Sequence, residues 1–280
     1  LQRYYSGAFK FRMGIERAVG ATTESNDPNH LGATLACTFP LFLLIALRDD
    51  RPWRRVLALA GAGVGVWTMA LTGSRSALVG FVVALGYLCW TSRRRWVFAA
   101  LAVGALVGGY SVLPEQYRQR YDSSQELDDS SQSRIAVWKT GLSMFADRPI
   151  AGVGLGCFSS ANAAYTGSWL QPHSLYVQAL AEIGLVGSIP FFAFLFQFMR
   201  RTRAGRKKLG EDPTWSFERT ALDGILGGGL VLLAAGIFGH SMLRRTWYFY
   251  AAISVVVWRL HHEEMSRRLL VSPPGNESNV

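Results

Sequence analysis

Apolar runs alternate with short polar segments along the chain, and each run has a length typical of a helix. Seven such runs recur, at residues 31–47, 56–72, 77–90, 96–113, 174–199, 221–243 and 246–260. A membrane-crossing helix needs about 20 residues, and these runs have about 15 to 26. The chain has 280 residues and is 50% hydrophobic. We therefore predict an all-α, polytopic membrane helical bundle with about seven spans.

The charges of the loops indicate a topology. Seven spans place successive loops on alternating sides, and the loops at 48–55, 92–95, 200–219 and 259–268 then share one side. All four are rich in Arg or Lys, so the positive-inside rule makes that side cytoplasmic. The net charge of +10 follows from this pattern. Nucleic-acid binding is disfavoured, because the basic residues lie between apolar runs rather than on one folded face.

Residues 114–172 form the one long polar stretch, which we predict to be a periplasmic loop. Its acidic, serine-rich part, residues 121–133, is typical of a mobile segment. An amphipathic helix that Pro149 ends is expected next, lying on the membrane surface. Its apolar residues recur at three- and four-residue steps: Ile135, Trp138, Leu142 and Phe145. Glycines at 152, 154 and 156 predict a bent connection, since no strand precedes them.

The chain is expected to be a single membrane domain over residues 1–280, with the periplasmic loop inside it. It opens at Leu1 on a polar stretch, which suggests the C-terminal part of a longer protein. The three cysteines, Cys37, Cys89 and Cys157, show neither a disulfide framework nor metal-ligand spacing. We expect no metal and no cofactor.

Arginines gather on the predicted outer face. Arg75 lies in a very short link, and Arg244 and Arg245 lie in another, on the side where positive charge is not favoured. Each alone could extend its charge to the membrane interface. As a set they favour a pocket for an anion, because guanidinium groups match phosphate oxygens bidentately and so suit a diphosphate.

His173 falls on the same side, at the end of the long polar loop. An unperturbed imidazole has a pKa of about 6.5 and can take a proton near neutral pH; the alternative is a structural hydrogen bond. A base beside a phosphate clamp indicates transfer of a group from a phosphorylated carrier to a hydroxyl. Glu182, within the fifth run, either faces the cavity or pairs with an arginine.

The sequence His173-Ser174, nine residues, Gly184, two residues, Gly187 resembles the signature of the O-antigen ligase superfamily. This is the Wzy-C group of bacterial membrane glycosyltransferases. Four further segments are similar to motifs of that family, in the family's order: NDPNHLG (26–32), TGSRSA (72–77), SRIAVW (133–138) and DRPIAGVGLGCF (147–158). The resemblance covers most of the chain.

The resemblance implies a GT-C-like fold in the bacterial inner membrane, with a periplasmic active face. It implies metal-independent transfer of a glycan from an undecaprenyl-diphosphate carrier to a lipid or glycan hydroxyl, in surface polysaccharide biosynthesis. His173 would be the base or would position the acceptor, and Arg75 and Arg134 would join it in catalysis by binding the diphosphate. The helpers in that binding would be Arg17, Arg244 and Arg245.

Two departures from the family leave alternatives open. Trp138 stands where the ligase motif has leucine, so O-antigen ligase, polysaccharide polymerase and protein O-oligosaccharyltransferase all remain. The family also usually has more spans, which implies further N-terminal helices. A transporter for a small anion such as bicarbonate would need ionisable residues near mid-membrane, and only Glu182 and Asp223 approach that. A non-catalytic envelope-complex subunit would leave the arginines and His173 unexplained, so we favour the enzyme.

Overall fold

The structure, a computed structural model, describes residues 7, 9–12, 15–20, 27–92, 95–122, 124–239 and 242–271. Two short strands pair antiparallel, β1 (Phe9–Arg12) and β2 (Ile15–Ala18). The helices are α2 (Pro28–Arg48), α3 (Pro52–Leu71), α4 (Arg75–Thr91), α5 (Arg95–Val112), α6 (Glu115–Asp122), α7 (Ser124–Asp147), α8 (Phe158–Thr166), α9 (Leu175–Lys208), the 3-10 helix η1 (Pro213–Trp215), α10 (Ser216–Ala235) and α11 (Arg245–Val271). The all-α prediction is confirmed, and each apolar run contains helix over most of its length.

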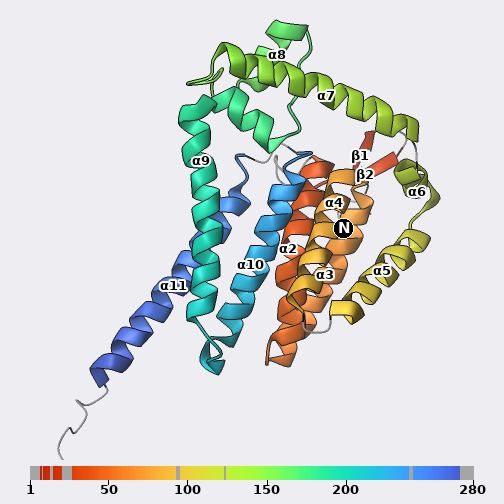
Figure 1. The fold of residues 1–280 in the computed structure, drawn as a ribbon. Helices are drawn as coiled ribbons and strands as arrows, with labels where there is room; N and C mark the ends of the chain where they lie inside the picture. The colour runs from red at the N-terminus through yellow and green to blue at the C-terminus, as the bar shows by residue number, and fades with distance from the viewer. Residues whose placement is uncertain are drawn as a thin grey trace, which may run out of the picture.

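Helix α2 lies at the centre of a bundle with α3, α4 and α10 (Figure 1). Glycines let α10 approach it closely: a Cβ on Gly224 would lie 2.5 Å from Leu41 Cα, and one on Gly228 would lie 2.5 Å from the Cys37 carbonyl oxygen. The hydroxyl of Tyr250 in α11 donates to that same carbonyl at 3.1 Å. Small residues thus set the tight crossing, as they do between membrane helices.

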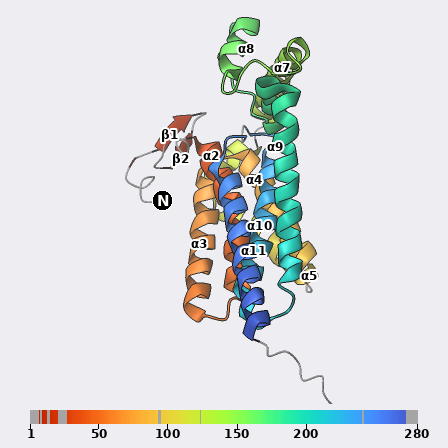
Figure 2. The same ribbon diagram turned by 90° about the vertical axis from the view of Figure 1, so that its left-hand side faces the viewer.

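Helices α7 and α8 form a layer across one end of the bundle (Figures 1 and 2). The described backbone of the acidic segment at 121–133 is helical on both sides of residue 123, and its mobility stays a prediction. Acidic residues suit the first turns of a helix, so this composition is compatible with one. The predicted helix is confirmed as part of α7, and its placement on the membrane surface stays a prediction. Val137 and Met144 are buried, whereas Ile135 and Leu142 are about half exposed.

Helix α9 bends sharply at Gly184 (Figure 1). Its first arm, Leu175–Ile183, packs against α7 in the end layer, through Val177 and Ala181. The second arm runs along the bundle to Lys208. The apolar run at 174–199 is therefore helical, as predicted, but the bend at Gly184 divides it into two arms. Gly184 adopts φ +54° and ψ −161°, a backbone conformation that only glycine adopts readily.

Helix α10 ends at Ala235, so the prediction that its apolar run stays helical to Leu243 is wrong. Beyond Gly236 the described residues are turns and bends up to Arg244. The backbone N–H of Leu175 donates to the Gly236 carbonyl at 2.7 Å. The apolar residues after α10 thus form an irregular segment that supports the start of α9.

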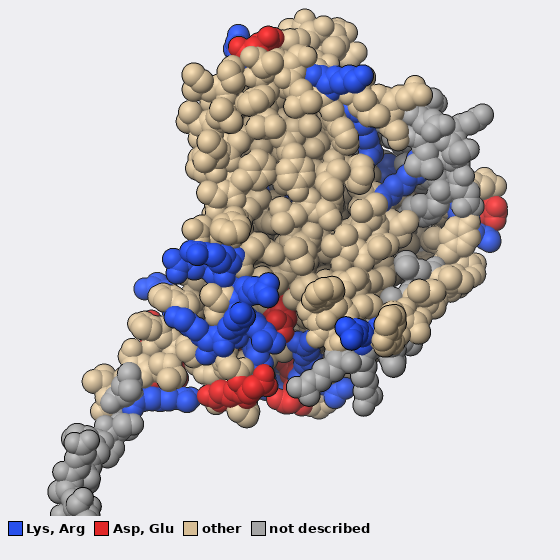
Figure 3. Space-filling model, in the orientation of Figure 1, with Lys and Arg blue, Asp and Glu red and all other residues tan. Residues whose placement is uncertain are grey.

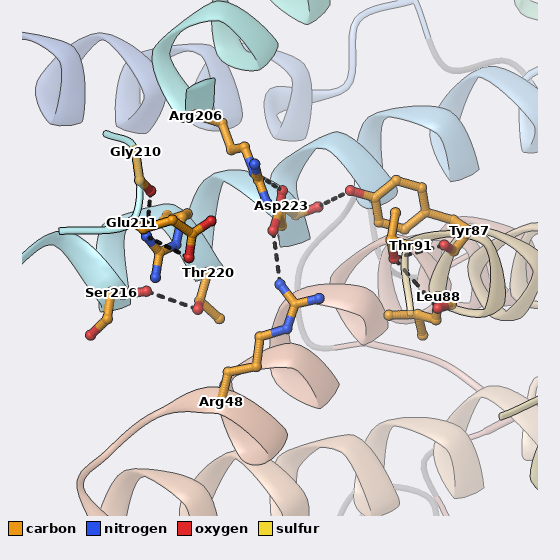
Figure 4. A network of polar contacts seen from close by, with 11 residues as sticks. Arg48, Tyr87, Leu88, Thr91, Arg206, Gly210, Glu211, Ser216, Thr220 and Asp223 are labelled. Atoms are coloured by element: carbon orange, nitrogen blue, oxygen red, sulfur yellow. Dashed lines mark hydrogen bonds and ion pairs between the residues drawn. The ribbon is translucent and has the colours of Figure 1, made fainter. Parts of the chain in front are cut away.

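The loops between helices divide between two ends of the bundle, as the alternating topology predicts (Figures 1 and 2). Most basic side chains on the face drawn in Figure 3 lie at the end opposite α7. There Asp223 of α10 bonds Arg48 of α2 at 2.8 Å and Arg206 of α9 at 3.0 Å, and Tyr87 of α4 donates to the Asp223 carbonyl at 2.8 Å (Figure 4). This network joins four helices.

Two helices in the described part of the chain are long and apolar enough to cross a membrane, α2 and α9. Helix α4 is apolar but shorter. The seven-span count therefore stays a prediction.

Candidate functional site

The turn before Arg75 is built by its own polar side chains. The Ser74 hydroxyl caps α4 by accepting from the Ala77 N–H at 3.3 Å, and it lies 3.1 Å from the Ser76 hydroxyl. Gly73 has φ +56°, which gives the chain its reversal between α3 and α4. Arg75 is consequently the first residue of α4, at the end of the bundle that α7 covers.

Two other segments hold this turn in place. A Cβ on Gly32 of α2 would lie 2.8 Å from Ala77 Cβ and 2.9 Å from the Thr72 hydroxyl, so α2 needs glycine there. Arg17 donates from Nε to the Thr72 carbonyl at 2.6 Å and from Nη2 to the Asn29 side-chain oxygen at 3.0 Å. The motifs at 26–32 and 72–77 thus meet in space. Within the first, Asn26 lies outside the described residues, and Asp27 caps α2 by accepting from the Asn29 N–H at 2.8 Å.

Helix α7 brings Arg134 close to Arg75. Burial lowers the pKa of the Arg134 guanidinium, and the positive charge of Arg75 lowers it further. Figure 3 shows basic side chains along a recess below the layer that contains α7. The structure therefore places two of the sequence-predicted arginines, from motifs about 60 residues apart, as electrostatic neighbours at one end of the bundle.

His173 lies immediately before the first arm of α9, with its backbone at φ +44°. His173 lines a narrow cavity together with Arg244, and that cavity has a volume of about 10 Å³, close to the minimum that holds one water molecule. The other residues around it include Asn29, His30, Ser76 and Phe238. His173, the turn beside Arg75 and the start of α11 therefore converge.

Of the remaining predicted arginines, only Arg244 lines this cavity. Arg244 is buried and donates from Nη1 to the Thr34 hydroxyl at 3.1 Å and to the His30 carbonyl at 3.3 Å. Arg17 is 3% exposed and lies behind the turn. Arg245 is the exposed first residue of α11 and does not line the cavity.

Gly184 and the glycine-rich connection 149–156 fit into each other. Leu185 and Val186 donate to the carbonyls of Pro149 and Ile150 at 2.8 and 3.1 Å, and Val153 donates to the Ala181 carbonyl at 2.8 Å. A Cβ on Gly184 would lie 2.7 Å from the Gly152 nitrogen. The motif spacing thereby gains a physical meaning. The nine residues of the motif between Ser174 and Gly184 form a helical arm, which is about 14 Å long at 1.5 Å per residue. This arm separates His173 from the bend.

Glu182 stabilises the same glycine-rich connection through hydrogen bonds. Its carboxylate accepts from the Gly156 N–H at 3.0 Å and from the Phe158 N–H at 3.3 Å, and it is 1% exposed. The sequence left two roles open for Glu182, facing the cavity or pairing with an arginine. The described structure shows neither, because the carboxylate accepts from backbone N–H groups. Gly187 lies one turn beyond the bend, with its missing Cβ against Ile183 of the first arm.

The sequence reasoning missed several residues of the site. Asn29 and His30 lie in the motif at 26–32, and Ser76 lies in the motif at 72–77, so these motifs were the available signal. Trp138, read only as a departure from the ligase motif, donates its indole N–H to the Pro172 carbonyl at 2.7 Å.

The fold and the site together define a helical protein with membrane-capable helices and a polar site of arginines and a histidine at one end. Residues 60–192 match the model of the Wzy_C family, described as O-antigen ligase. The match confirms the resemblance seen in the motifs over this segment of the chain. The match includes Arg75, Arg134, His173 and both motif glycines. A search of curated proteins found no match.

The family match supports a glycosyltransferase-type enzyme with a role in surface polysaccharide biosynthesis. Together with the two apolar helices, it supports a membrane protein. Lipid-linked glycan donors and their acceptors are the general partners that the family implies.

Proposed function

We propose that this protein transfers a glycan from undecaprenyl diphosphate to a hydroxyl acceptor at the periplasmic face of the bacterial inner membrane. Two observations support the proposal: Arg134 is an electrostatic neighbour of Arg75, and His173 lines a cavity with Arg244 and with Ser76, the residue after Arg75. Guanidinium pairs bind diphosphate oxygens bidentately, and a histidine beside them can accept a proton. The family match supports a glycosyltransferase-type enzyme.

The closeness of Arg75 and Arg134 favours a doubly charged ligand. Two like charges near each other repel, and partial burial strengthens that repulsion because the local dielectric constant is low. An anion between them offsets the repulsion. A diphosphate is larger than the cavity beside His173, so we place it outside that cavity, between Arg75 at the start of α4 and Arg134 of α7.

The proposed reaction is a displacement at the anomeric carbon. The acceptor oxygen forms the new bond to that carbon, and the bond from the carbon to the diphosphate oxygen breaks. The leaving diphosphate takes the electron pair and is stabilised by Arg75 and Arg134, while His173 takes the acceptor proton. No metal is assigned a role in this scheme.

The other arginines serve as helpers in this scheme. Arg244 contributes positive charge to the cavity that His173 lines. Arg17 maintains the turn that presents Arg75, through its bond to the Thr72 carbonyl. Arg245, at the exposed start of α11, would meet the donor as it approaches from the membrane surface.

The distribution of charge supports the periplasmic assignment. The Arg- and Lys-rich loops lie at the end opposite the site, and positive loops remain cytoplasmic in membrane proteins. The transporter alternative loses support, because its two candidate carboxylates are engaged elsewhere. Glu182 binds backbone N–H groups, and Asp223 binds two arginines at the basic end.

The test uses a bacterium whose surface polysaccharide depends on this gene. Its deletion is complemented with the full-length protein carrying His173→Ala, Arg134→Ala or Arg75→Ala, at matched membrane levels. We expect loss of surface glycan with accumulation of undecaprenyl-linked glycan. Arg148→Ala is the control, because this exposed arginine of the same layer lies outside the proposed site. Normal glycan in the His173 and arginine variants would contradict the proposal.

A further inference from the structure

The bond between Trp138 and Pro172 joins helix α7 to the residue before His173. The indole Nε1 donates to the Pro172 carbonyl at 2.7 Å, and Pro172 is buried. This distance is at the short end of the range for such bonds. Trp138 therefore fixes the peptide plane from which the His173 side chain departs.

His173 needs such a constraint, because its φ of +44° lies in the left-handed region. Residues other than glycine are uncommon there and remain only where the surroundings determine the conformation. On the other side, Ser174 caps the first arm of α9 by accepting from the Val177 N–H at 3.4 Å. Leu175 is bound to the Gly236 carbonyl at 2.7 Å. The chain is thus held both before and after His173.

Trp138 and Arg134 lie four residues apart on α7, so they share one face of the helix. That helix is packed rigidly against the first arm of α9. Val137 and Met144 are buried, and a Cβ on Gly141 would lie 2.5 Å from Val177 Cγ1. One turn of one helix therefore presents the arginine and also holds the backbone beside the histidine.

We infer that Trp138 is a positioning residue, which sets the imidazole of His173 relative to the Arg75 and Arg134 pair through its N–H group rather than through its bulk. The inference rests on the proposed function for its catalytic consequence. Its structural consequence, the orientation of His173, can be measured without turnover.

The experiment replaces Trp138 of the full-length protein with β-(3-benzothienyl)alanine, which keeps the shape of the indole but has no N–H. The same replacement at Trp90, 88% exposed at the far end of α4, is the matched control. Modification of His173 by diethyl pyrocarbonate is followed by mass spectrometry in detergent. His261 and His262, on α11, serve as internal references.

Loss of one hydrogen bond should make modification of His173 about fivefold faster, with His261 and His262 unchanged. In a transfer assay, kcat should fall about tenfold while KM for the lipid-linked donor stays within about twofold. The Trp90 replacement should change neither. Trp138→His, which can restore an N–H donor, should recover part of kcat.

Unchanged modification of His173 in the Trp138 variant would overturn the inference, and so would a rise in KM without a fall in kcat. The reactivity of His173 can change as expected while the protein with its natural Trp138 transfers no glycan. In that case the positioning role stands and the proposed function fails. The two failures are therefore distinguishable.

Discussion

Arg17 donates from Nε to the carbonyl oxygen of Thr72 at 2.6 Å and thereby ties strand β2 to the turn that precedes Arg75. Because Arg17 is 3% exposed, we expect it to act by holding that turn. Arg17→Lys keeps the charge but loses the guanidinium group, which bonds the Thr72 carbonyl and the Asn29 side chain together. It should lower the free energy of unfolding by about 2 kcal/mol, the range for hydrogen bonds to charged groups. Thermal unfolding in detergent measures this loss. An unchanged Tm with weaker donor binding would instead make Arg17 a direct ligand.

Arg134→Lys should weaken donor binding rather than stability, in contrast to Arg17→Lys. Arg134 is only partly buried and neighbours Arg75, so its replacement should leave Tm nearly unchanged. A lysine cannot bind a diphosphate bidentately, so KM for the donor should rise about tenfold. Donor titrations of the transfer rate measure the change. A large fall in Tm would show that Arg134 has a structural role.

The two-armed shape of α9 depends on Gly184. Gly184→Ala adds a Cβ against the Ile150 carbonyl at φ +54°, and we expect a loss of about 3 kcal/mol from strain and overlap together. Gly63→Ala is the control, since nothing lies within 4 Å of its missing Cβ. It should be neutral or stabilising by about 0.5 kcal/mol. Unfolding of both variants in detergent tests the comparison. Equal changes in stability would contradict the claim that the bend depends on Gly184.

Glu182 should be needed for folding of the glycine-rich connection. Glu182→Gln leaves one amide oxygen for two N–H donors and turns its NH₂ group toward the other donor. We expect about 2 kcal/mol of destabilisation and faster proteolysis between residues 149 and 158, with donor KM unchanged in the folded fraction. If Glu182→Gln instead altered ion flux in proteoliposomes without loss of stability, the transporter reading would regain support.

Asp223 should contribute to stability rather than to transfer. Asp223→Asn weakens its bonds to Arg48 and Arg206, and because both arginines are over one third exposed we expect only about 1 to 2 kcal/mol. Glu211→Gln is the control, because its carboxylate is 94% exposed and lies 4.0 Å from Arg219. Thermal unfolding and transfer rates are measured together. Lost transfer with unchanged Tm would place Asp223 in a functional role.

Much of the fold could be predicted from the hydrophobic pattern, because every apolar run is helical over most of its length. The pattern could not show where a run stops being straight. Ile237, Phe238 and Leu243 continue the apolar character of α10, yet the chain turns at Gly236. The hairpin of β1 and β2 was missed because its strands have only four residues each and lie in a polar segment.

The site could be predicted only as a set of residues on one side. Charge and topology brought Arg75, Arg134, Arg244 and His173 to one side, and the resemblance assigned Arg134 a role in binding the diphosphate. Neither could show the bonds that orient them. The contacts of Trp138 with Pro172 and of Arg17 with Thr72 join residues 34 and 55 positions apart, which no local pattern records.

The most direct test of the account is conversion of undecaprenyl-diphosphate-linked glycan to undecaprenyl diphosphate by the full-length protein in proteoliposomes. The cell's own glycolipid fraction is the acceptor, and donor binding is measured in parallel. His173→Gln should slow conversion by about 10² to 10⁴, the usual effect of removing a general base, and should leave donor binding unchanged. Conversion by His173→Gln at the rate of the unaltered protein would contradict the account.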